Sequence, residues 1–422
     1  MDVPAPPLGT TNFRPRHLLA EVREALADTR VVLIAGARQV GKSTLARMAI
    51  EGRSGVTAIT LDEEATRSAA LADPAGFVET HGLLLIDEVQ RVPELFLAIK
   101  AAVDRANRPG HFLLTGSANI LLLPQVADAL PGRMQIVELW PFSQGELSGR
   151  IERFLDRCFD GWQGARIETT LGRRDYLELA ATGGFPEAVA RTDRRRRSVW
   201  FESYVQTLLQ RDLLNLSAVE RIADVSRLLR LLAARSSTVL NIDGLARDAE
   251  MPTTTVRRYL TLLQAAYMIL LVPAWSNNRT TRAIHAPKVV MGDSGLCAHL
   301  VGADADGLAS PLGDAGPLLE TFVVTELRKQ LGWCMDRPRM FHYRTRDGVE
   351  VDVVLEAPDG RVVGIEVKAA ATVRSADFAG LRHLAGRTGD RFQCGLVLYT
   401  GRQSLPFGSK LWCTPVSALW EA

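Results

Sequence analysis

A glycine-rich segment near the start of the chain constrains the fold more than any other feature. Residues 36–44 read GARQVGKST and match the pattern G-x-x-x-x-G-K-[ST]. The segment follows an apolar run at 30–36 and precedes the helical run STLARMAI. A strand, an anion-binding loop and a helix form the context that this pattern needs, so we expect such a loop here. The alternative is an ordinary strand–turn–helix with a surface lysine.

The loop predicts a binding site for ATP and Mg²⁺. Its backbone amides would form an anion nest, and the helix that starts near Lys42 would add the positive end of its dipole. Lys42 would reach the β- and γ-phosphates, and the Ser43 hydroxyl would ligate Mg²⁺. The predicted nucleotide-binding residues of the loop are Gly36, Ala37, Arg38, Gln39, Val40, Gly41, Lys42, Ser43 and Thr44.

Two later apolar runs end in polar residues that would complete this site. Asp87 and Glu88 close the run LLLIDE, at the carboxyl end of a predicted strand, where ligands bind in open α/β sheets. Asp87 would hold Mg²⁺ through water, and Glu88 would orient the attacking water. In LLTGSAN, Thr115 or Ser117 could sense the γ-phosphate, and we favour Ser117. Plain transitions from strand to loop are the alternative at both places.

The same apolar runs predict the architecture around the loop. They are short, they are separated by helical patterns, and they lie at 30–36, 57–64, 82–88 and 111–117. Alternation of strands and helices implies crossover connections and a parallel sheet.

Residues 238–267 fit a helix-turn-helix template. The pattern predicts a short helix over 242–249, a turn over 250–253 and a second helix that Thr253 or Thr254 would cap. Apolar residues of the second helix would pack inward, its arginines would point outward, and the hairpin that follows could be a wing. The predicted DNA-binding residues are Arg257, Arg258, Arg279 and Arg282. A protein scaffold is the alternative role for such a unit.

A second set of charged residues lies in the C-terminal third. Asp352 in EVDVVLE and the pair Glu366 and Lys368 in GIEVKAA fall on two successive predicted strands, and the latter two share a face. An upstream helix carries Glu320 and Glu326, of which only one would point at the site. Asp352 and Glu366 would hold Mg²⁺, and Lys368 would place a point charge near the nucleophile. An exposed amphipathic strand is the alternative.

The order of these motifs resembles a bacterial and archaeal family of AAA-like ATPases in which a C-terminal domain of unassigned function follows. GARQVGKST, LLLIDEVQ, LLTGSAN and PGRMQIVELWPFSQGE carry the resemblance, which extends through GGFPEAV and LLETFVVTELRK over nearly the whole chain. By that similarity Arg133 is expected to contact phosphate in trans, with a surface salt bridge as the alternative, and a homo-oligomer is expected. The spacing D-x(13)-E-x-K is similar to the nuclease core of restriction-endonuclease-like and Holliday-junction-resolvase enzymes.

The predicted fold class is α/β. It combines a P-loop NTPase parallel sheet, a helical and winged-helix middle region, and a C-terminal α/β restriction-endonuclease-like domain. The predicted domains are a P-loop AAA-like ATPase domain at 1–145, a helical lid or linker at 146–235, a winged-helix-like domain at 236–305 and a nuclease-like domain at 306–422.

Composition limits the partners and the compartment. The net charge is +2, so any nucleic-acid surface must come from local clusters of Arg and Lys. The five cysteines form no C-x-x-C pair, which favours a reducing compartment. No apolar stretch reaches the ~18 residues of a membrane span, and the first residues lack the pattern of a signal peptide. We therefore expect a cytoplasmic protein without a membrane partner.

Together these features predict a protein that binds and hydrolyses ATP and acts on DNA, with a Mg²⁺-dependent nuclease-like C-terminal domain. The alternative is an ATP-regulated switch or scaffold whose nuclease-like domain is inactive and binds DNA or a protein partner. A small-molecule kinase is disfavoured, because the chain shows no obvious acceptor-binding lid and the downstream domains would be unexplained.

Overall fold

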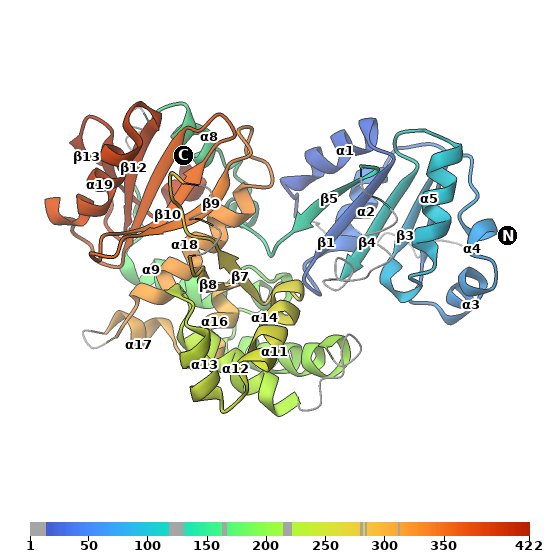
Figure 1. Ribbon diagram of the computed structural model, residues 1–422, viewed down its shortest axis with the longest axis horizontal. Coiled ribbons are helices and arrows are strands. Elements are labelled where there is room, and N and C mark those ends of the chain that lie inside the picture. Colours follow the sequence, from blue (N-terminus) through green and yellow to red (C-terminus); the bar gives the residue numbers. More distant parts are fainter. Residues whose placement is uncertain are drawn as a thin grey trace.

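The computed structural model describes residues 14–117, 130, 132–162, 167–213, 222–278, 282, 285–310 and 313–422. Within these ranges the strands form three sheets of five, three and six strands. Figure 1 shows the five-stranded and six-stranded sheets beside one another, with the smallest sheet and its helices below them. Across the same ranges, no helix combines the length and the apolar character that crossing a membrane requires.

The N-terminal sheet is parallel and has the order β2-β3-β4-β1-β5. Its strands are β1 (Val31–Gly36), β2 (Val56–Thr60), β3 (Leu83–Asp87), β4 (Phe112–Ser117) and β5 (Met134–Leu139). The four predicted runs form β1 to β4, which confirms the parallel sheet. No prediction covered β5, because only Val137 and Leu139 of this edge strand are buried and its sequence lacks a continuous apolar run.

Helices of the N-terminal unit flank the sheet and position the loop. They are α1 (Leu18–Asp28), α2 (Lys42–Ile50), α3 (Glu64–Ala72), α4 (Pro74–Phe77), the 3₁₀ turn η1 (Val89–Arg91) and α5 (Leu95–Arg105). Since β4 lies between β1 and β3, the carboxyl ends of these three strands meet at one edge of the sheet. The residues of all three motifs are thereby brought together.

The region predicted as a helical lid or linker, 146–235, is mainly helical, and several of its helices pack against neighbouring units. Its elements are α7 (Gln144–Ser148), α8 (Phe154–Phe159), α9 (Arg173–Thr182), α10 (Pro186–Val189), α11 (Arg194–Thr207), the π-helix η3 (Leu208–Leu213) and α12 (Ile222–Ala234). Helix α8 packs against the C-terminal sheet and α9 packs against α16, α17 and α18. Helices of this region therefore contact the C-terminal unit, and a separate lid or linker domain stays a prediction.

The middle unit contains the two predicted helices and a small antiparallel sheet. Helix α13 (Ile242–Ala249) coincides with the predicted first helix, and α14 (Thr253–Ala265) begins at the predicted turn. Strands β6 (Thr238–Val239), β8 (Lys288–Met291) and β7 (Ile269–Val272) follow in this spatial order. The predicted threonine cap is wrong, because Pro252 occupies the N-cap position and both threonines lie inside the helix.

The C-terminal sheet has the order β13-β14-β12-β11-β10-β9. Its strands are β9 (Arg339–Arg344), β10 (Glu350–Glu356), β11 (Val362–Lys368), β12 (Phe392–Tyr399), β13 (Leu405–Gly408) and β14 (Leu411–Pro415). The helices of the last third of the chain are α16 (Ser294–Val301), α17 (Ala305–Ala309), α18 (Gly316–Gln330), η4 (Ser375–Phe378), α19 (Ala379–Thr388), η5 (Gly389–Arg391) and α20 (Ala418–Glu421). Strands β9, β10 and β11 are antiparallel, whereas β11, β12 and β14 are parallel.

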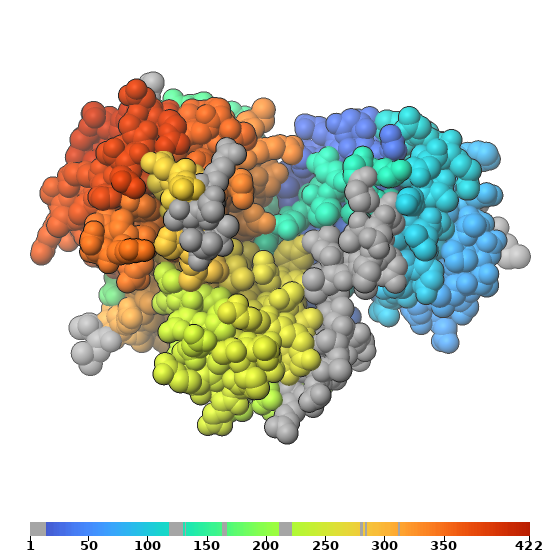
Figure 2. All heavy atoms as spheres, viewed as in Figure 1, coloured from blue at the N-terminus to red at the C-terminus, as the bar shows by residue number. Residues whose placement is uncertain are grey.

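The middle unit is docked on the edge of the C-terminal sheet. Just beyond β7, Ala274 forms a parallel bridge with His342 of β9, whose amide donates to the Pro273 carbonyl oxygen at 2.9 Å. Ser236 and Ser237 hydrogen-bond the Thr321 hydroxyl of α18 at 2.7 and 3.1 Å. Figure 2 shows the yellow-green middle unit in continuous contact with the orange C-terminal unit. These two units therefore form one packed body.

Candidate functional site

The glycine-rich loop is shaped by two glycines with different tasks. A Cβ on Gly36 would lie 2.2 Å from the Leu139 carbonyl oxygen of β5, so only glycine permits this close approach of the two strands. Gly41 has φ +96°, a left-handed conformation that side chains disfavour. Gln39 also has positive φ, +62°. Left-handed conformations at alternate residues turn successive backbone amides toward one centre, as an anion nest requires.

The two predicted Mg²⁺ residues meet although they are far apart in sequence. The Ser43 hydroxyl donates to Asp87 Oδ1 at 2.7 Å across a separation of 44 residues. Thr115 donates to the same carboxylate oxygen at 2.5 Å and accepts from the Glu88 amide at 3.1 Å. A hydroxyl and a carboxylate this close present the hard oxygen ligands that Mg²⁺ takes, so the residues fit the predicted ion.

Glu88 is held by a residue that the sequence analysis missed. The Gln90 side-chain amide donates to Glu88 Oε2 at 2.5 Å and to the Ser117 hydroxyl at 2.8 Å. Glu88 itself has a left-handed backbone, with φ +59°. Gln90 therefore connects the acidic end of β3 with the polar end of β4.

Lys42 lies along the loop and is almost fully buried. Its ammonium donates to the carbonyl oxygens of Ala37 at 2.8 Å and Gly36 at 3.2 Å. These contacts keep the charge at the mouth of the anion nest, where a small rotation of a flexible side chain can bring it to a phosphate.

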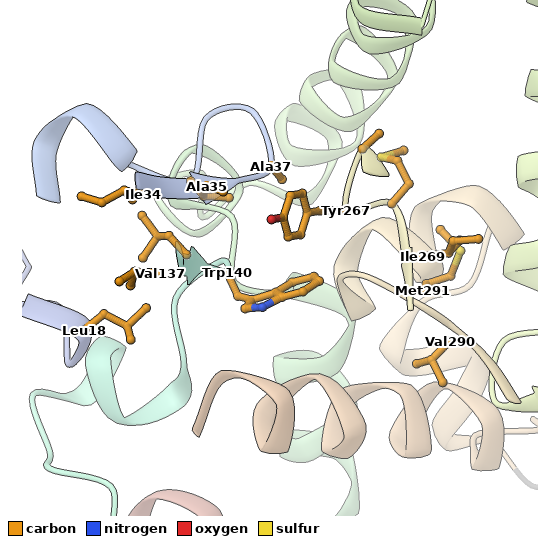
Figure 3. Close-up of a cluster of buried hydrophobic side chains, with 14 of the residues drawn as sticks. Leu18, Ile34, Ala35, Ala37, Val137, Trp140, Tyr267, Ile269, Val290 and Met291 are labelled. Atoms are coloured by element: carbon orange, nitrogen blue, oxygen red, sulfur yellow. The ribbon is translucent and has the colours of Figure 1, made fainter. Parts of the chain in front are cut away.

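Side chains from outside the loop hold it in place, some of them from other units. Arg16 donates to the Val40 carbonyl oxygen at 3.0 Å, and the Tyr204 hydroxyl of α11 donates to the Arg38 carbonyl oxygen at 3.4 Å. Figure 3 shows the Tyr267 ring beside Ala37. This ring packs edge-on to Trp140 with centroids 5.0 Å apart. A cavity of about 460 Å³ lies next to the loop and is lined by Gln39, Gly41, Pro186, Glu187, Arg191 and Trp200.

Arg133 lies at the opposite edge of the sheet from the loop. It immediately precedes β5, its carbonyl oxygen accepts from the Val31 amide, and its guanidinium pairs with Asp104 at 2.6 Å. Gly36 pairs with the far end of β5, so roughly 20 Å of strand separates Arg133 from the loop. Arg133 cannot reach the phosphate site of its own subunit, and a role in trans stays a prediction.

The predicted C-terminal residues also come together. Lys368 lies 3.4 Å from Glu366, and Asp352 Oδ2 accepts from the Val367 amide at 2.9 Å. Burial, reinforced by Asp352, raises the pKa of Glu366 to about 9. Burial and the Asp352 charge also raise the pKa of Glu320 to about 7.

Of the two helix glutamates, only Glu320 points at this cluster. Glu326 lies elsewhere, where it pairs with Lys329 at 2.5 Å and accepts from the Gln144 amide at 2.8 Å. It therefore belongs to the contact between α18 and α7.

A lysine that no prediction named occupies the cluster. Lys288 of β8 lies 2.5 Å from Glu320 and 3.4 Å from Asp352. Burial alone would lower the pKa of Lys288, but the two carboxylates outweigh it and raise the pKa, so the side chain is an ammonium. Over the described part of the chain, no group of three or more His, Cys, Asp or Glu side chains is placed to hold a metal ion. The Mg²⁺ site at Asp352 and Glu366 stays a prediction, and the Lys288 ammonium lies beside one of its two carboxylates.

The four predicted DNA-contacting arginines have different surroundings. Arg257 and Arg258 are exposed on α14, as predicted. Arg282, predicted to bind DNA, instead pairs with Glu356 and faces the rings of Trp275 and Phe341. Its guanidinium is tied to the C-terminal unit. Arg279 lies outside the described residues.

Comparisons with known proteins divide the chain in a similar way. A family model described as an AAA domain matches residues 28–148. Models described as domains of unknown function, DUF8612 and DUF4143, match residues 173–307 and 315–419. Uncharacterized protein Rv2008c of Mycobacterium tuberculosis is 31% identical over 359 residues, which are 85% of this chain and 74% of that protein. Uncharacterized protein Mb2031c of Mycobacterium bovis matches to the same extent.

The chain belongs to the family of these mycobacterial proteins. In this family member the AAA match covers the parallel sheet and the glycine-rich loop, so the N-terminal unit is an ATPase domain of the P-loop type. The DUF4143 match covers the sheet that carries the C-terminal charge cluster, and it assigns no activity to that sheet.

Solved structures that resemble this family member do so at low similarity. The Walker-type ATPase PABY2304 of Pyrococcus abyssi is 16% identical, covers 68% of this chain and 96% of its own, and has a TM-score of 0.42. The RuvB Holliday junction branch migration motor of Thermotoga maritima is 20% identical, covers 60% of this chain and 87% of its own, and has a TM-score of 0.28.

Sequence reasoning missed three residues of this family member for one shared reason. Gln90, Tyr267 and Lys288 each act through a segment that is distant in sequence. Only Gln90 carried a usable signal, since it stands two residues after Glu88 in the motif DEVQ.

Proposed function

We propose that this protein hydrolyses ATP at its N-terminal loop and uses the nucleotide to control an action on DNA. The observation that carries the proposal is the 2.7 Å contact between Ser43 and Asp87, which joins the two halves of the predicted ATP site. Glu88 lies next to this contact and is held by Gln90. The arrangement combines phosphate binding, metal ligands and a base in one place.

Each residue of the site has a definite task in hydrolysis. Backbone amides of the loop and the Lys42 ammonium would bind the phosphate oxygens and offset their charge. Ser43 and Asp87 would hold Mg²⁺, which supplies charge neutralisation on the phosphates when bound. Glu88 would accept a hydrogen bond from the attacking water and orient it toward the γ-phosphorus.

Contacts around the loop support communication with the rest of the molecule. Tyr204 belongs to α11, and Tyr267 follows α14 of the middle unit. The Tyr204 hydroxyl donates to the loop, and the Tyr267 ring lies beside it in Figure 3. A shift of the loop upon ATP binding would therefore be transmitted to segments outside the ATPase domain.

Action on DNA is supported by the exposed arginines of α14 and by the order of the C-terminal elements. Arg257 and Arg258 lie on the outer face of the second helix of a helix-turn-helix pair. The C-terminal sequence α18, β9, β10, β11, α19, β12 follows the helix–meander–helix–strand order of a restriction-endonuclease-like core, with its carboxylates on β10 and β11. We therefore propose a winged-helix-like unit joined to a nuclease-like domain.

A second function is favoured by a specific observation. The hairpin that would serve as a wing is docked on β9, and Lys288 fills the C-terminal charge cluster. Both features suit an ATP-regulated switch or scaffold whose nuclease-like domain is inactive.

Hydrolysis is tested with Lys42→Ala and Glu88→Gln, measured as phosphate release from ATP. We expect each variant to lose about 100-fold or more of the wild-type turnover, because each removes a group needed in the transition state. Lys100→Ala, on α5 away from the loop, is the matched control. Full activity in Lys42→Ala would refute the site.

DNA action is tested by DNA binding over a range of salt concentrations, with and without ATP. The double variant Arg257→Ala/Arg258→Ala should bind more weakly and lower the salt slope by about 2. Lys100→Ala/Arg105→Ala on α5 removes the same charge and should bind as wild type does. Equal DNA affinity of both double variants, or a DNA affinity that does not change with ATP, would favour the switch or scaffold.

A further inference from the structure

We infer that the C-terminal charge cluster is a composite centre of two units in which the Lys288 ammonium takes the place of a divalent cation. The inference deepens the proposed nuclease-like domain and rests on it. In this arrangement a metal ion can enter only after Lys288 has left.

The position of Lys288 is that of a ligand-bound cation. Its nitrogen lies between a carboxylate from α18 and a carboxylate from β10, at 2.5 Å from Glu320 and 3.4 Å from Asp352. The Lys288 side chain is only 7% exposed, and each carboxylate side chain is 15% exposed. A surface salt bridge would leave these groups in water, whereas here they are withdrawn from it together.

Charge balance explains why the cluster tolerates burial. Glu320, Asp352 and Glu366 place three acidic groups in one buried patch, and burying such groups without cations is costly. Lys368 balances one of them from β11, and Lys288 supplies the second ammonium. Removal of Lys288 alone would leave two buried acids to find another cation or a proton.

An ammonium and a metal ion exclude each other here. Mg²⁺ binds carboxylate oxygens at about 2.0–2.1 Å, so an ion on Glu320 and Asp352 would lie within a few ångströms of the Lys288 nitrogen. Both cations would compete for the same oxygens, and their mutual repulsion in a poorly solvated site is strong. Lys288 therefore lowers the metal affinity of the cluster while β8 stays docked.

Docking of β8 holds Lys288 in place. The Ala286 carbonyl oxygen, two residues before Lys288, lies 3.2 Å from His342 Nε2 of β9. Arg282, earlier in the same hairpin, is paired with Glu356 at the far end of β10. Withdrawal of Lys288 thus requires the hairpin to leave the edge of the C-terminal sheet.

The test measures Mn²⁺ binding to the full nucleotide-free chain, by titration followed with electron paramagnetic resonance. Lys288→Met should bind one Mn²⁺ at least about tenfold more tightly than wild type, because the competing ammonium is gone. Lys288→Met/Asp352→Asn should lose that added site. Lys410→Met is the matched control, since Lys410 also lies in the C-terminal unit and its ammonium donates to the Phe392 carbonyl oxygen, away from the cluster.

Two results would overturn the inference. One is a wild-type Mn²⁺ site that depends on Asp352 and is as tight as that of Lys288→Met. The other is the absence of any Asp352-dependent gain in Lys288→Met and in Lys288→Gln, whose amide can keep a hydrogen bond to Glu320 if the methionine disturbs folding.

Cleavage of DNA by the same proteins separates this inference from the proposed function. If Lys288→Met binds an additional Mn²⁺ but does not cleave DNA, the result supports the inference and refutes an active nuclease. Mn²⁺-dependent cleavage by wild type that Asp352→Asn abolishes supports a nuclease and refutes exclusion by Lys288.

Discussion

Gln90 shows how one side chain can organise a catalytic edge. Its amide nitrogen contacts both Glu88 and Ser117, while its amide oxygen is buried without a hydrogen-bond partner among the described residues. A glutamine with its donors used and its acceptor unused is fixed in orientation mainly by Glu88 and Ser117. In the proposed hydrolysis, Gln90 would position Glu88, and Glu88 would contact the attacking water.

Gln90→Leu keeps the side-chain volume and removes both hydrogen bonds. We expect ATP turnover to fall about 10- to 100-fold while the KM for ATP changes little, because supporting residues typically contribute this much through the groups they orient. Steady-state kinetics measure both constants. Gln135→Leu, which removes the 2.8 Å hydrogen bond from Gln135 of β5 to Glu21 of α1, is the matched control. A rise in KM with constant turnover would assign Gln90 to binding instead.

At the scale of elements, the junction between α14 and β7 links the ATPase domain to the middle unit. Tyr267 lies at this junction with a left-handed backbone, φ +56°, and its ring packs against Trp140 and lies beside Ala37 of the loop in Figure 3. Its hydroxyl is buried and has no hydrogen-bond partner in the described structure. Packing of the ring, rather than the hydroxyl, therefore makes the contact.

Tyr267→Phe and Tyr267→Ala separate these two contributions. Tyr267→Phe should leave the free energy of unfolding unchanged or raise it by about 1 kcal/mol, since an unpaired buried hydroxyl costs stability. Tyr267→Ala should lower it by about 3–5 kcal/mol through lost packing. Urea unfolding gives both values. A large loss in Tyr267→Phe would mean that the hydroxyl has a partner.

The edge where the middle unit meets β9 carries a pH-sensitive residue. Burial lowers the pKa of His342 from its ordinary 6.5 to about 4. The folded state therefore binds fewer protons than the unfolded state between these values, and stability falls as the pH decreases.

His342→Gln should remove this part of the acid sensitivity. Between pH 6.5 and pH 4 the variant should lose less stability than wild type, by at most about 3 kcal/mol. Unfolding by urea at several pH values measures the difference. The exposed His383→Gln is the control and should follow wild type. Parallel pH profiles for wild type and His342→Gln would contradict the assignment.

At the scale of the whole molecule, one continuous path joins the two charged sites. Tyr267 at the loop is followed directly by β7, β7 pairs with β8, and β8 carries Lys288 into the C-terminal cluster. The middle unit is therefore placed to relate the state of the ATP site to the state of the carboxylates.

The position of Arg133 makes a prediction about assembly. Since this residue is remote from its own loop, it can serve hydrolysis only in a neighbouring subunit. Arg133→Ala and Lys42→Ala should each be inactive alone, and mixing them should restore part of the activity, because intact loops then meet intact arginines. Phosphate release from the mixture measures this. Full activity of Arg133→Ala alone would reduce the residue to a salt bridge with Asp104.

Local patterns in the sequence determined the ATP loop, the first four strands of its sheet, the helix over 242–249 and the strands that carry Asp352 and Glu366. Each of these depends on the period of apolar residues or on backbone conformations within about ten neighbouring positions. A short stretch of sequence is therefore enough to predict these elements.

Only the tertiary structure decided the interaction partners of Arg282, Lys288 and Gln90 and the position of Arg133. Arg282 was predicted to bind DNA and Lys288 was given no role, yet docking of the hairpin on β9 brings both side chains to acidic residues of the C-terminal unit. Arg133 was placed at the remote edge by the parallel pairing of β5 with β1. The partner of a charged side chain depends on which surfaces pack together in the fold, because the interaction of two charges depends on their distance in space. The spacing of residues in the sequence does not reveal that distance.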